Sequence, residues 1–181
     1  MLNTNPDYSI AAIAISQPIY FAFGFRESDG AALRDRFNEA LNAMKADKTL
    51  NHFKTNYIAN PGVETPEAVQ FAKFDGAETI KVAVTGDLPP IDYIAPDGTP
   101  AGFNTAMLAE LGKRMKVNIQ LVQVEAGARA AALSSQRADV VFWFQVRAGE
   151  DVQPDVPKGV ILSEAYYDWT KYLHIRKKTA K

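Results

Sequence analysis

The 181-residue chain contains no cysteine, and this absence excludes several kinds of chemistry. Disulfide bonds, thiolate catalysis and zinc sites built on cysteine are ruled out. The two histidines, His52 and His174, stand alone in the sequence and support neither a metal site nor a catalytic triad. No acid and base are paired at a catalytic spacing, so we expect no metal, no cofactor and no enzymatic activity.

The sequence also lacks a long apolar run and a large net charge. The longest apolar run near the start, Ile10–Ile15, is too short to span a membrane, and no basic stretch precedes it. No signal peptide is therefore visible, and we expect no direct insertion into a membrane. The net charge of −1 gives no reason to expect nucleic acid as a partner. Apolar residues make up 47% of the chain, which is enough for a sizeable buried core.

The first third of the chain predicts a strand followed by two helices. Pro18–Phe25 is apolar and aromatic, as buried strands are. Ser28 or Asp29 is expected to cap the next helix, whose apolar residues recur at helical spacing at Leu33, Phe37, Leu41 and Met44. Asp47 is expected to cap a second helix, with an inward face formed by Leu50, Phe53 and Tyr57.

The remainder reads as a connector followed by alternating strands and helices. Residues 58–79 form the connector, with a short helix expected from Thr65 to about Phe74. From Ile80 the pattern runs strand, helix, strand, helix, strand, with Asn104 expected to cap the first helix and a last strand at Trp169–Ile175. This alternation is typical of a parallel sheet covered on both faces, so we predict an α/β three-layer sandwich with a mostly parallel central sheet.

Four stretches between residues 80 and 177 together resemble one protein family. They are, in chain order, IKVAVTGDLPPIDY, DGTPAGFNTAMLAELGKRMKV, ARAAALSSQRADVVF and LSEAYYDWTKYLHIRKK. They resemble the first lobe of extracellular solute-binding proteins of family three, the polar amino-acid receptors of ABC importers. The resemblance implies a periplasmic binding protein of type two that takes part in amino acid transport in the periplasm.

An earlier stretch resembles the end of the same proteins, so the segments stand in permuted order. Residues 20–57 follow the family's closing strand and two helices, with Lys48 where Gly is usual. We predict one α/β lobe over residues 1–181, in which residues 18–57 and 80–177 pack together around the connector. Three origins fit this order: a circularly permuted lobe, the junction of two tandem receptors, or two chains that exchange segments as a homodimer.

The resemblance also indicates where a ligand would bind and what is missing there. In the family, the ligand cleft usually carries a Thr and an Arg after the strand that here ends near Phe144. The Arg guanidinium forms two parallel hydrogen bonds with the ligand's carboxylate. Here the Arg position falls at Asp151 and the Thr position at Val146 or Ala148. Our candidate ligand-binding residues come from two segments, the loop after the strand at Ile80–Thr85 and the end of the apolar strand near Phe144. They are Asp87 and Tyr93 in the loop, and Trp143, Gln145 and Arg147 at the strand end.

Two functions follow as hypotheses from these residues. The first is a solute-binding module for an amino acid or small organic acid, with altered or weakened binding. The second is an interaction or self-association domain that has lost solute binding, because Trp143 and Phe144 are bulky where small residues are usual. For Trp143 and Phe144 we favour packing, since adjacent strand residues point to opposite faces of a sheet.

Overall fold

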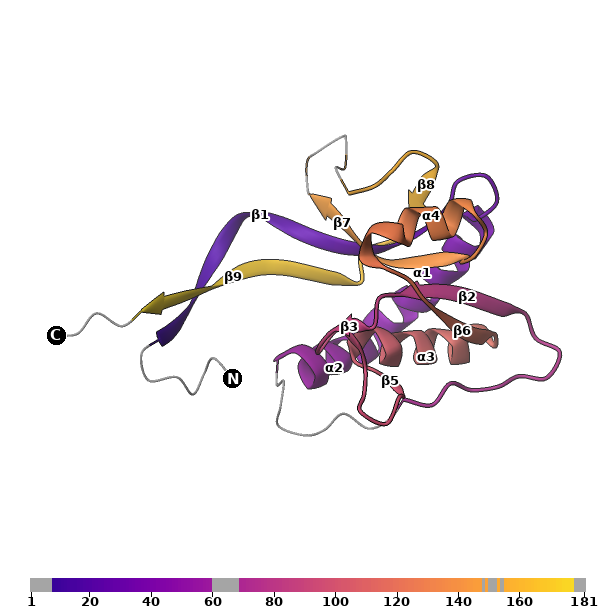
Figure 1. Ribbon diagram of the computed structural model, residues 1–181, viewed down its shortest axis with the longest axis horizontal. Helices are drawn as coiled ribbons and strands as arrows, with labels where there is room; N and C mark the ends of the chain where they lie inside the picture. Colours follow the sequence, from indigo (N-terminus) through magenta and orange to yellow (C-terminus); the bar gives the residue numbers. More distant parts are fainter. Residues whose placement is uncertain (1–7, 60–68, 148, 150–152, 154, 178–181) are drawn as a thin grey trace.

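The computed structural model describes residues 8–59, 69–147, 149, 153 and 155–177. Its centre is a six-stranded sheet in the order β6-β2-β7-β1-β8, with β9 paired to β1 (Figure 1). The strands are β1 (Tyr8–Arg26), β2 (Thr79–Val84), β6 (Asn118–Gln123), β7 (Val140–Arg147), β8 (Val160–Leu162) and β9 (Tyr167–Lys177). A small second sheet is formed by β3 (Asp87–Leu88), β4 (Asp92–Ile94) and β5 (Pro100–Ala101).

Strand direction in the central sheet confirms the predicted, mostly parallel arrangement. Strand β2 is parallel to both β6 and β7. Strand β1 is antiparallel to β7, β8 and β9, so it alone runs against the other strands of this sheet. This antiparallel strand, β1, comes first in the chain, before the strands β2, β6 and β7 that form the parallel unit.

Helices cover both faces of this sheet and complete the predicted three layers. Helices α1 (Ala31–Ala46), α2 (Thr49–Phe53) with its π-helical continuation (Lys54–Ala59), and α3 (Phe103–Met115) pack on one face. The short 3-10 turn Ala126–Ala128 and α4 (Arg129–Ser134) lie on the other. The larger core includes Phe23, Phe25, Phe37, Leu41, Met107 and Leu108, and the smaller one includes Ala83, Leu133, Val141 and Phe144.

The helix starts differ in part from the sequence prediction. Helix α1 begins after Gly30 without a side-chain cap, because Asp29 instead binds Arg26 at 2.9 Å. The Asp47 carboxylate accepts a hydrogen bond from the Thr49 backbone at the start of α2, as expected. The cap position itself is held by Lys48, whose φ is +67°.

The prediction of a helix in the connector, from Thr65 to about Phe74, is wrong for the part of it that the structure describes. Residues 69–74 have no helical structure, and 65–68 lie outside the described residues. The physical reason is a competing partner for the Phe74 backbone, which exchanges two hydrogen bonds with the Asn118 side chain, at 2.9 and 3.0 Å. These bonds tie the connector to β6 in an irregular conformation.

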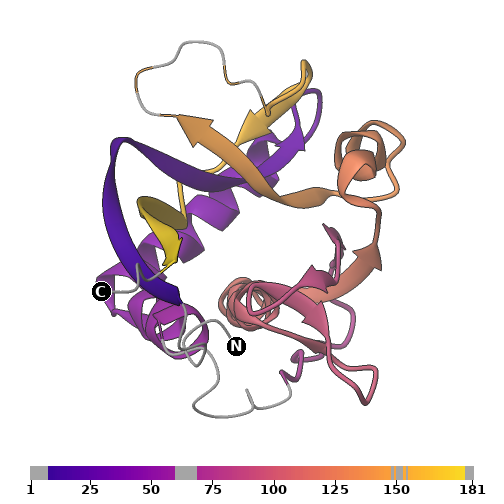
Figure 2. The same cartoon turned by 60° about the vertical axis from the view of Figure 1, so that its left-hand side comes forward.

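The predicted first and last strands are confirmed, but β1 is far longer than expected. Strand β1 begins at Tyr8, and its first part pairs with β9 from Tyr8 opposite Lys177 to Ala14 opposite Lys171. This β1–β9 ribbon extends away from the helices in Figure 1, and in Figure 2 the molecule is turned so that the ribbon comes forward. Further along, from Ile19, β1 enters the sheet and pairs with β7 as well.

Candidate functional site

The loop after β2 forms one wall of a pocket and is shaped by a buried carboxylate. Asp92 is 5% exposed and accepts hydrogen bonds from the Thr85 backbone at 2.9 Å and the Thr85 hydroxyl at 3.5 Å. Burial raises the pKa of Asp92, although hydrogen bonds from the Gly86 and Thr85 backbone oppose this rise. Asp92 therefore folds the loop back on itself and carries Asp87 to the pocket rim.

The opposite wall is a bulge in β7. Ala22 of β1 pairs with Phe144 of β7, and Gly24 pairs with Val141. The single β1 residue between these pairs, Phe23, therefore lies opposite two residues of β7, Phe142 and Trp143. The backbone of Trp143 is left-handed, with φ of +70°, which is an unfavourable conformation for a bulky residue. The bulge turns both aromatic side chains toward the loop after β2.

Three contacts hold Trp143 in this strained conformation. Its backbone N–H donates to the hydroxyl of buried Tyr166 at 3.1 Å, and its carbonyl accepts from Arg129 at 2.7 Å. Its ring stacks on Phe21, with ring centroids 4.1 Å apart. Residues held in strained backbone conformations by their surroundings are concentrated at binding and active sites.

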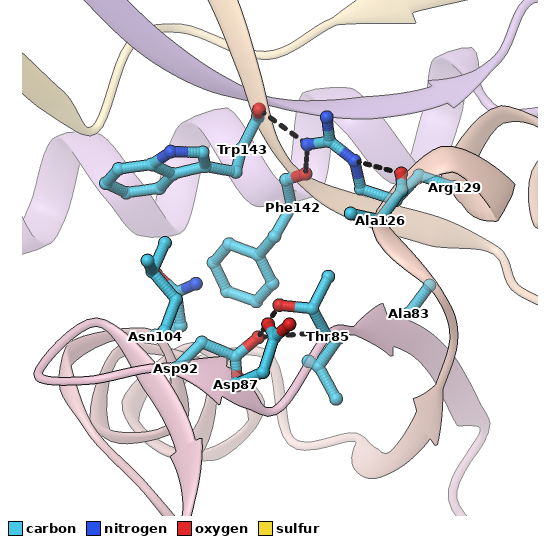
Figure 3. A pocket seen from close by; sticks show the side chains of 11 residues that line it. Ala83, Thr85, Asp87, Asp92, Asn104, Ala126, Arg129, Phe142 and Trp143 are labelled. Carbon is cyan, nitrogen blue, oxygen red and sulfur yellow. Dashed lines mark hydrogen bonds between the residues drawn. The ribbon is translucent and has the colours of Figure 1, made fainter.

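The pocket lies where the parallel strands separate. Pairing between β2 and β7 ends at Ala83 and Val141, and β2 stands between β6 and β7, so the sheet order reverses at this point. Open α/β sheets bind ligands at such a switch point, beyond the carboxyl ends of the strands. The cavity measures about 290 Å³, and the residues that line it include Thr85, Asp87, Asp92, Asn104, Ala126, Arg129, Phe142 and Trp143 (Figure 3).

Arg129 lines the pocket, but its guanidinium is bound to the protein itself. Its Nε donates to the Ala126 carbonyl at 3.1 Å, and its Nη1 donates to the Phe142 and Trp143 carbonyls at 3.1 and 2.7 Å (Figure 3). Its Nη2 lies 3.8 Å from the Asp155 carboxylate. Nε and Nη1 are thus hydrogen-bonded to the protein and Nη2 takes part in an ion pair, so Arg129 fixes the carbonyls of the bulge.

Asn104 is a site residue for which the sequence suggested a different role. The expectation that it caps α3 is wrong: it lies inside the first turn, 2% exposed, and its backbone N–H donates to the Ile91 carbonyl. Its side-chain oxygen is buried and has no hydrogen-bond partner within the described residues. Buried polar atoms without a partner are rare and costly, so this amide requires an explanation.

The structure brings together only part of the predicted set of ligand-binding residues. Asp87 and Trp143 both line the pocket. Tyr93 pairs with Asp87 between β4 and β3 but is not among the residues that line the pocket. Gln145 and Arg147 lie further along β7, where their backbone N–H groups donate to Asp155 and Gln153. Of the altered anchor positions, Asp151 and Ala148 lie outside the described residues, and Val146 pairs with Tyr20.

Comparison with known proteins identifies the family. Residues 80–180, more than half of the chain, match the bacterial extracellular solute-binding proteins, family 3. The chain belongs to this family. A search of curated proteins gives no match. In the described part of the chain, none of the helices has the length and apolar character of a membrane span.

Solved structures of solute-binding proteins resemble the chain at low sequence identity. A dipeptide-binding protein from Pseudoalteromonas sp. SM9913 is 12% identical with a TM-score of 0.46, and the match covers 78% of this chain and 31% of that one. A phosphate-binding protein from Streptococcus pneumoniae TIGR4 is 12% identical with a TM-score of 0.45, covering 88% and 52%. NikA from Brucella suis is 13% identical with a TM-score of 0.41, covering 83% and 34%. The chain thus spans between about a third and a half of their lengths.

Proposed function

We propose that this member of the solute-binding family is a binding module that holds a small molecule in the pocket between the loop after β2 and the bulge of β7. The observation that carries the proposal is the Asn104 side chain, which lines the pocket and is almost fully buried, and whose oxygen has no hydrogen-bond partner in the part of the chain that the structure describes. A bound solute would supply the missing partner. The pocket contains no paired acid and base arranged for catalysis, so the proposed role is binding without turnover.

Asp87, Asn104 and Trp143 are the residues that we propose to contact the ligand. They come from β3, α3 and β7, so three separate elements converge on one cavity. Tyr93, Gln145 and Arg147 remain proposed contacts only for a ligand large enough to extend beyond the cavity. We further propose that the protein works in the periplasm, as the family does, and this is tested by its release when the outer membrane is opened.

We also propose that binding is weaker than in the amino-acid receptors that the family is known for. The pocket lies at the small end of the range for ligand sites, and its one arginine is bound to backbone carbonyls. A receptor for α-amino acids needs a guanidinium free to form two parallel bonds with the ligand's carboxylate. We expect dissociation constants in the micromolar to millimolar range, on the order of −8 to −4 kcal/mol.

A thermal-shift screen followed by calorimetric titration tests the proposal. The panel should contain amino acids, small organic acids, small amines, dipeptides and phosphate, and we expect at least one class to raise the melting temperature. Ala126→Phe should abolish binding, because Ala126 is exposed and lines the pocket. Ala131→Phe is the matched control, since Ala131 is exposed on α4 and is not among the lining residues. Binding that survives Ala126→Phe would place the ligand elsewhere.

Self-association is a second candidate function, and the β1–β9 ribbon favours it. The outer part of this ribbon has two strands, and two-stranded ribbons are marginally stable in water unless another element covers them. A second copy of the chain pairing along the ribbon would supply such cover. Light scattering over a concentration series tests this, because a homodimer predicts a mass that doubles as the concentration rises, whereas a constant monomer mass would exclude it.

A further inference from the structure

We infer that the pocket selects a protonated amine carried on a small apolar body, and that it does not select a carboxylate. This inference rests on the proposed function, since it names the class of solute for the same pocket. It is drawn from the charges that face the cavity, from the partners of Arg129 and from the unpaired amide of Asn104.

The charged groups at the pocket favour a cation. Among the described residues that line the cavity, two carry carboxylates, Asp87 and Asp92, and one carries a guanidinium, Arg129. Within the described residues Asp87 forms no ion pair, whereas Arg129 lies 3.8 Å from a third carboxylate, that of Asp155. An ammonium group placed beside Asp87 gains a favourable Coulomb interaction, and a carboxylate in the same place is repelled.

The hydrogen-bond donors of the pocket cannot serve a carboxylate as the family's arginine does. The Arg129 Nε and Nη1 atoms already donate to three backbone carbonyls. Freeing them would leave the carbonyls of Phe142 and Trp143 without these donors and would release the strained turn at Trp143. A ligand carboxylate could therefore pair with Nε or Nη1 only by breaking the bonds that hold the bulge, and at Nη2 it would meet the Asp155 carboxylate.

Asn104 provides the second polar contact. A half-turn of its amide about χ2 exchanges the nitrogen and oxygen positions, and so presents the oxygen to the cavity as an acceptor. An ammonium group has three donors and no acceptor, so it can satisfy Asp87 and the Asn104 oxygen together. The pairing would give the Asn104 oxygen the hydrogen-bond partner that it lacks among the described residues.

The rest of the lining sets the size and character of the ligand's body. Val84, Leu88, Phe142 and Trp143 supply apolar surface. Trp143 stacks on Phe21 and Tyr167, at 4.1 and 5.7 Å between centroids, so its ring is fixed. A cavity of about 290 Å³ fits a single ring with a short side chain.

Three probes of nearly equal shape test the inference by calorimetric titration at neutral pH and low salt: phenethylamine, 3-phenylpropionate and 2-phenylethanol. We expect the amine to bind at least about tenfold more tightly than the acid and the alcohol, which corresponds to about 1.4 kcal/mol. Asp87→Asn should weaken amine binding by about tenfold and change alcohol binding by much less, because only the amine loses a charge interaction. Asp35→Asn is the control, because it removes the same charge from an exposed site on α1.

The possible outcomes separate this inference from the proposed function. If the acid or the alcohol binds as tightly as the amine, and Ala126→Phe abolishes that binding, the amine selectivity is wrong and the proposed pocket stands. Amine binding that is equal in the Asp87→Asn and Asp35→Asn proteins also overturns the inference. If no probe and no member of the wider panel binds, the proposed function fails and the inference fails with it.

Discussion

Lys48 has a left-handed backbone conformation, which is unfavourable for a residue with a side chain and which glycine adopts readily. It joins α1 to α2 with φ of +67°, in the left-handed region where a side chain is unfavourable and glycine is not. Glycine has no Cβ atom and adopts this conformation without the steric cost that the lysine side chain incurs.

Replacing Lys48 with glycine should stabilise the protein. We expect Lys48→Gly to raise the free energy of unfolding by about 0.5–1 kcal/mol, measured by urea denaturation. Lys113→Gly is the control, because Lys113 is exposed in the last turn of α3 and has no left-handed backbone, so glycine there should cost up to about 1 kcal/mol. A loss of stability of similar size in both variants would contradict the strain assigned to Lys48.

Asp47 gives a pH dependence with a defined direction. Hydrogen bonds from the Thr49 hydroxyl and backbone, and then from Arg114 on α3, lower the pKa of Asp47 from 3.8 to about 2. A lowered carboxyl pKa stabilises the fold above pH 3.8, and this stabilisation is lost as the pH falls through 2. We expect Asp47→Asn to melt below the parent protein at neutral pH, and the difference in melting temperature to shrink as the pH falls from 4 to 2.

At the scale of elements, the bulge in β7 explains both what the sequence predicted and what it missed. Asp87 and Trp143 could be predicted to lie near the pocket, because ligand sites follow the carboxyl ends of parallel strands. Phe142 could not, since strict alternation puts neighbours on opposite faces and only the bulge brings Phe142 and Trp143 to one cavity. Asn104 was missed because a polar residue at a helix start reads as a cap, and its burial depends on the packing of α3 against the rest of the chain.

The crossing of β1 and β7 depends on the absence of a side chain at Gly24. A Cβ atom there would collide with the Phe144 ring, which is buried on the α4 face. Gly24→Ala should therefore lower the free energy of unfolding by about 1–3 kcal/mol in a denaturation experiment. Gly127→Ala is the matched control, because no atom lies within 4 Å of a Cβ at Gly127 and little change is expected. Equal stability of the two variants would show that Phe144 is free to move aside.

The two parts of β1 should differ in hydrogen exchange. Residues Phe21–Phe25 lie within the sheet between β7 on one side and β8 or β9 on the other, and all five are buried. Residues Ile10–Ala14 pair with β9 alone. We expect the amides of Ile10–Ala14 to exchange at least about tenfold faster, as measured by mass spectrometry. Equal protection along β1 in a monomer would contradict this, whereas equal protection that appears with dimer formation would place the contact on the ribbon.

At the scale of the whole molecule, the sequence predicted the class of fold but not the direction of every strand. The predicted order of strand, helix, strand, helix, strand is present from β2 to β7, because local periodicity determines parallel units of this kind, whereas the short strands β3, β4, β5 and β8 were not predicted. The antiparallel insertion of β1 between β7 and β8 could not be read from periodicity, since it depends on contacts between residues more than 100 positions apart, such as Phe25 with Val140. The assignment of the whole chain to one lobe remains a prediction.

The central claim is that this chain binds a small solute in the pocket beside Trp143, and a fluorescence titration tests it most directly. The chain has two tryptophans, so Trp169→Phe leaves Trp143 as the reporter on the pocket wall. Any solute that raises the melting temperature, phenethylamine first, should change the Trp143 emission in a saturable way, and Ala126→Phe should abolish the change. A solute that stabilises the protein without altering Trp143 emission, or that acts equally on the Ala126→Phe variant, would contradict the account.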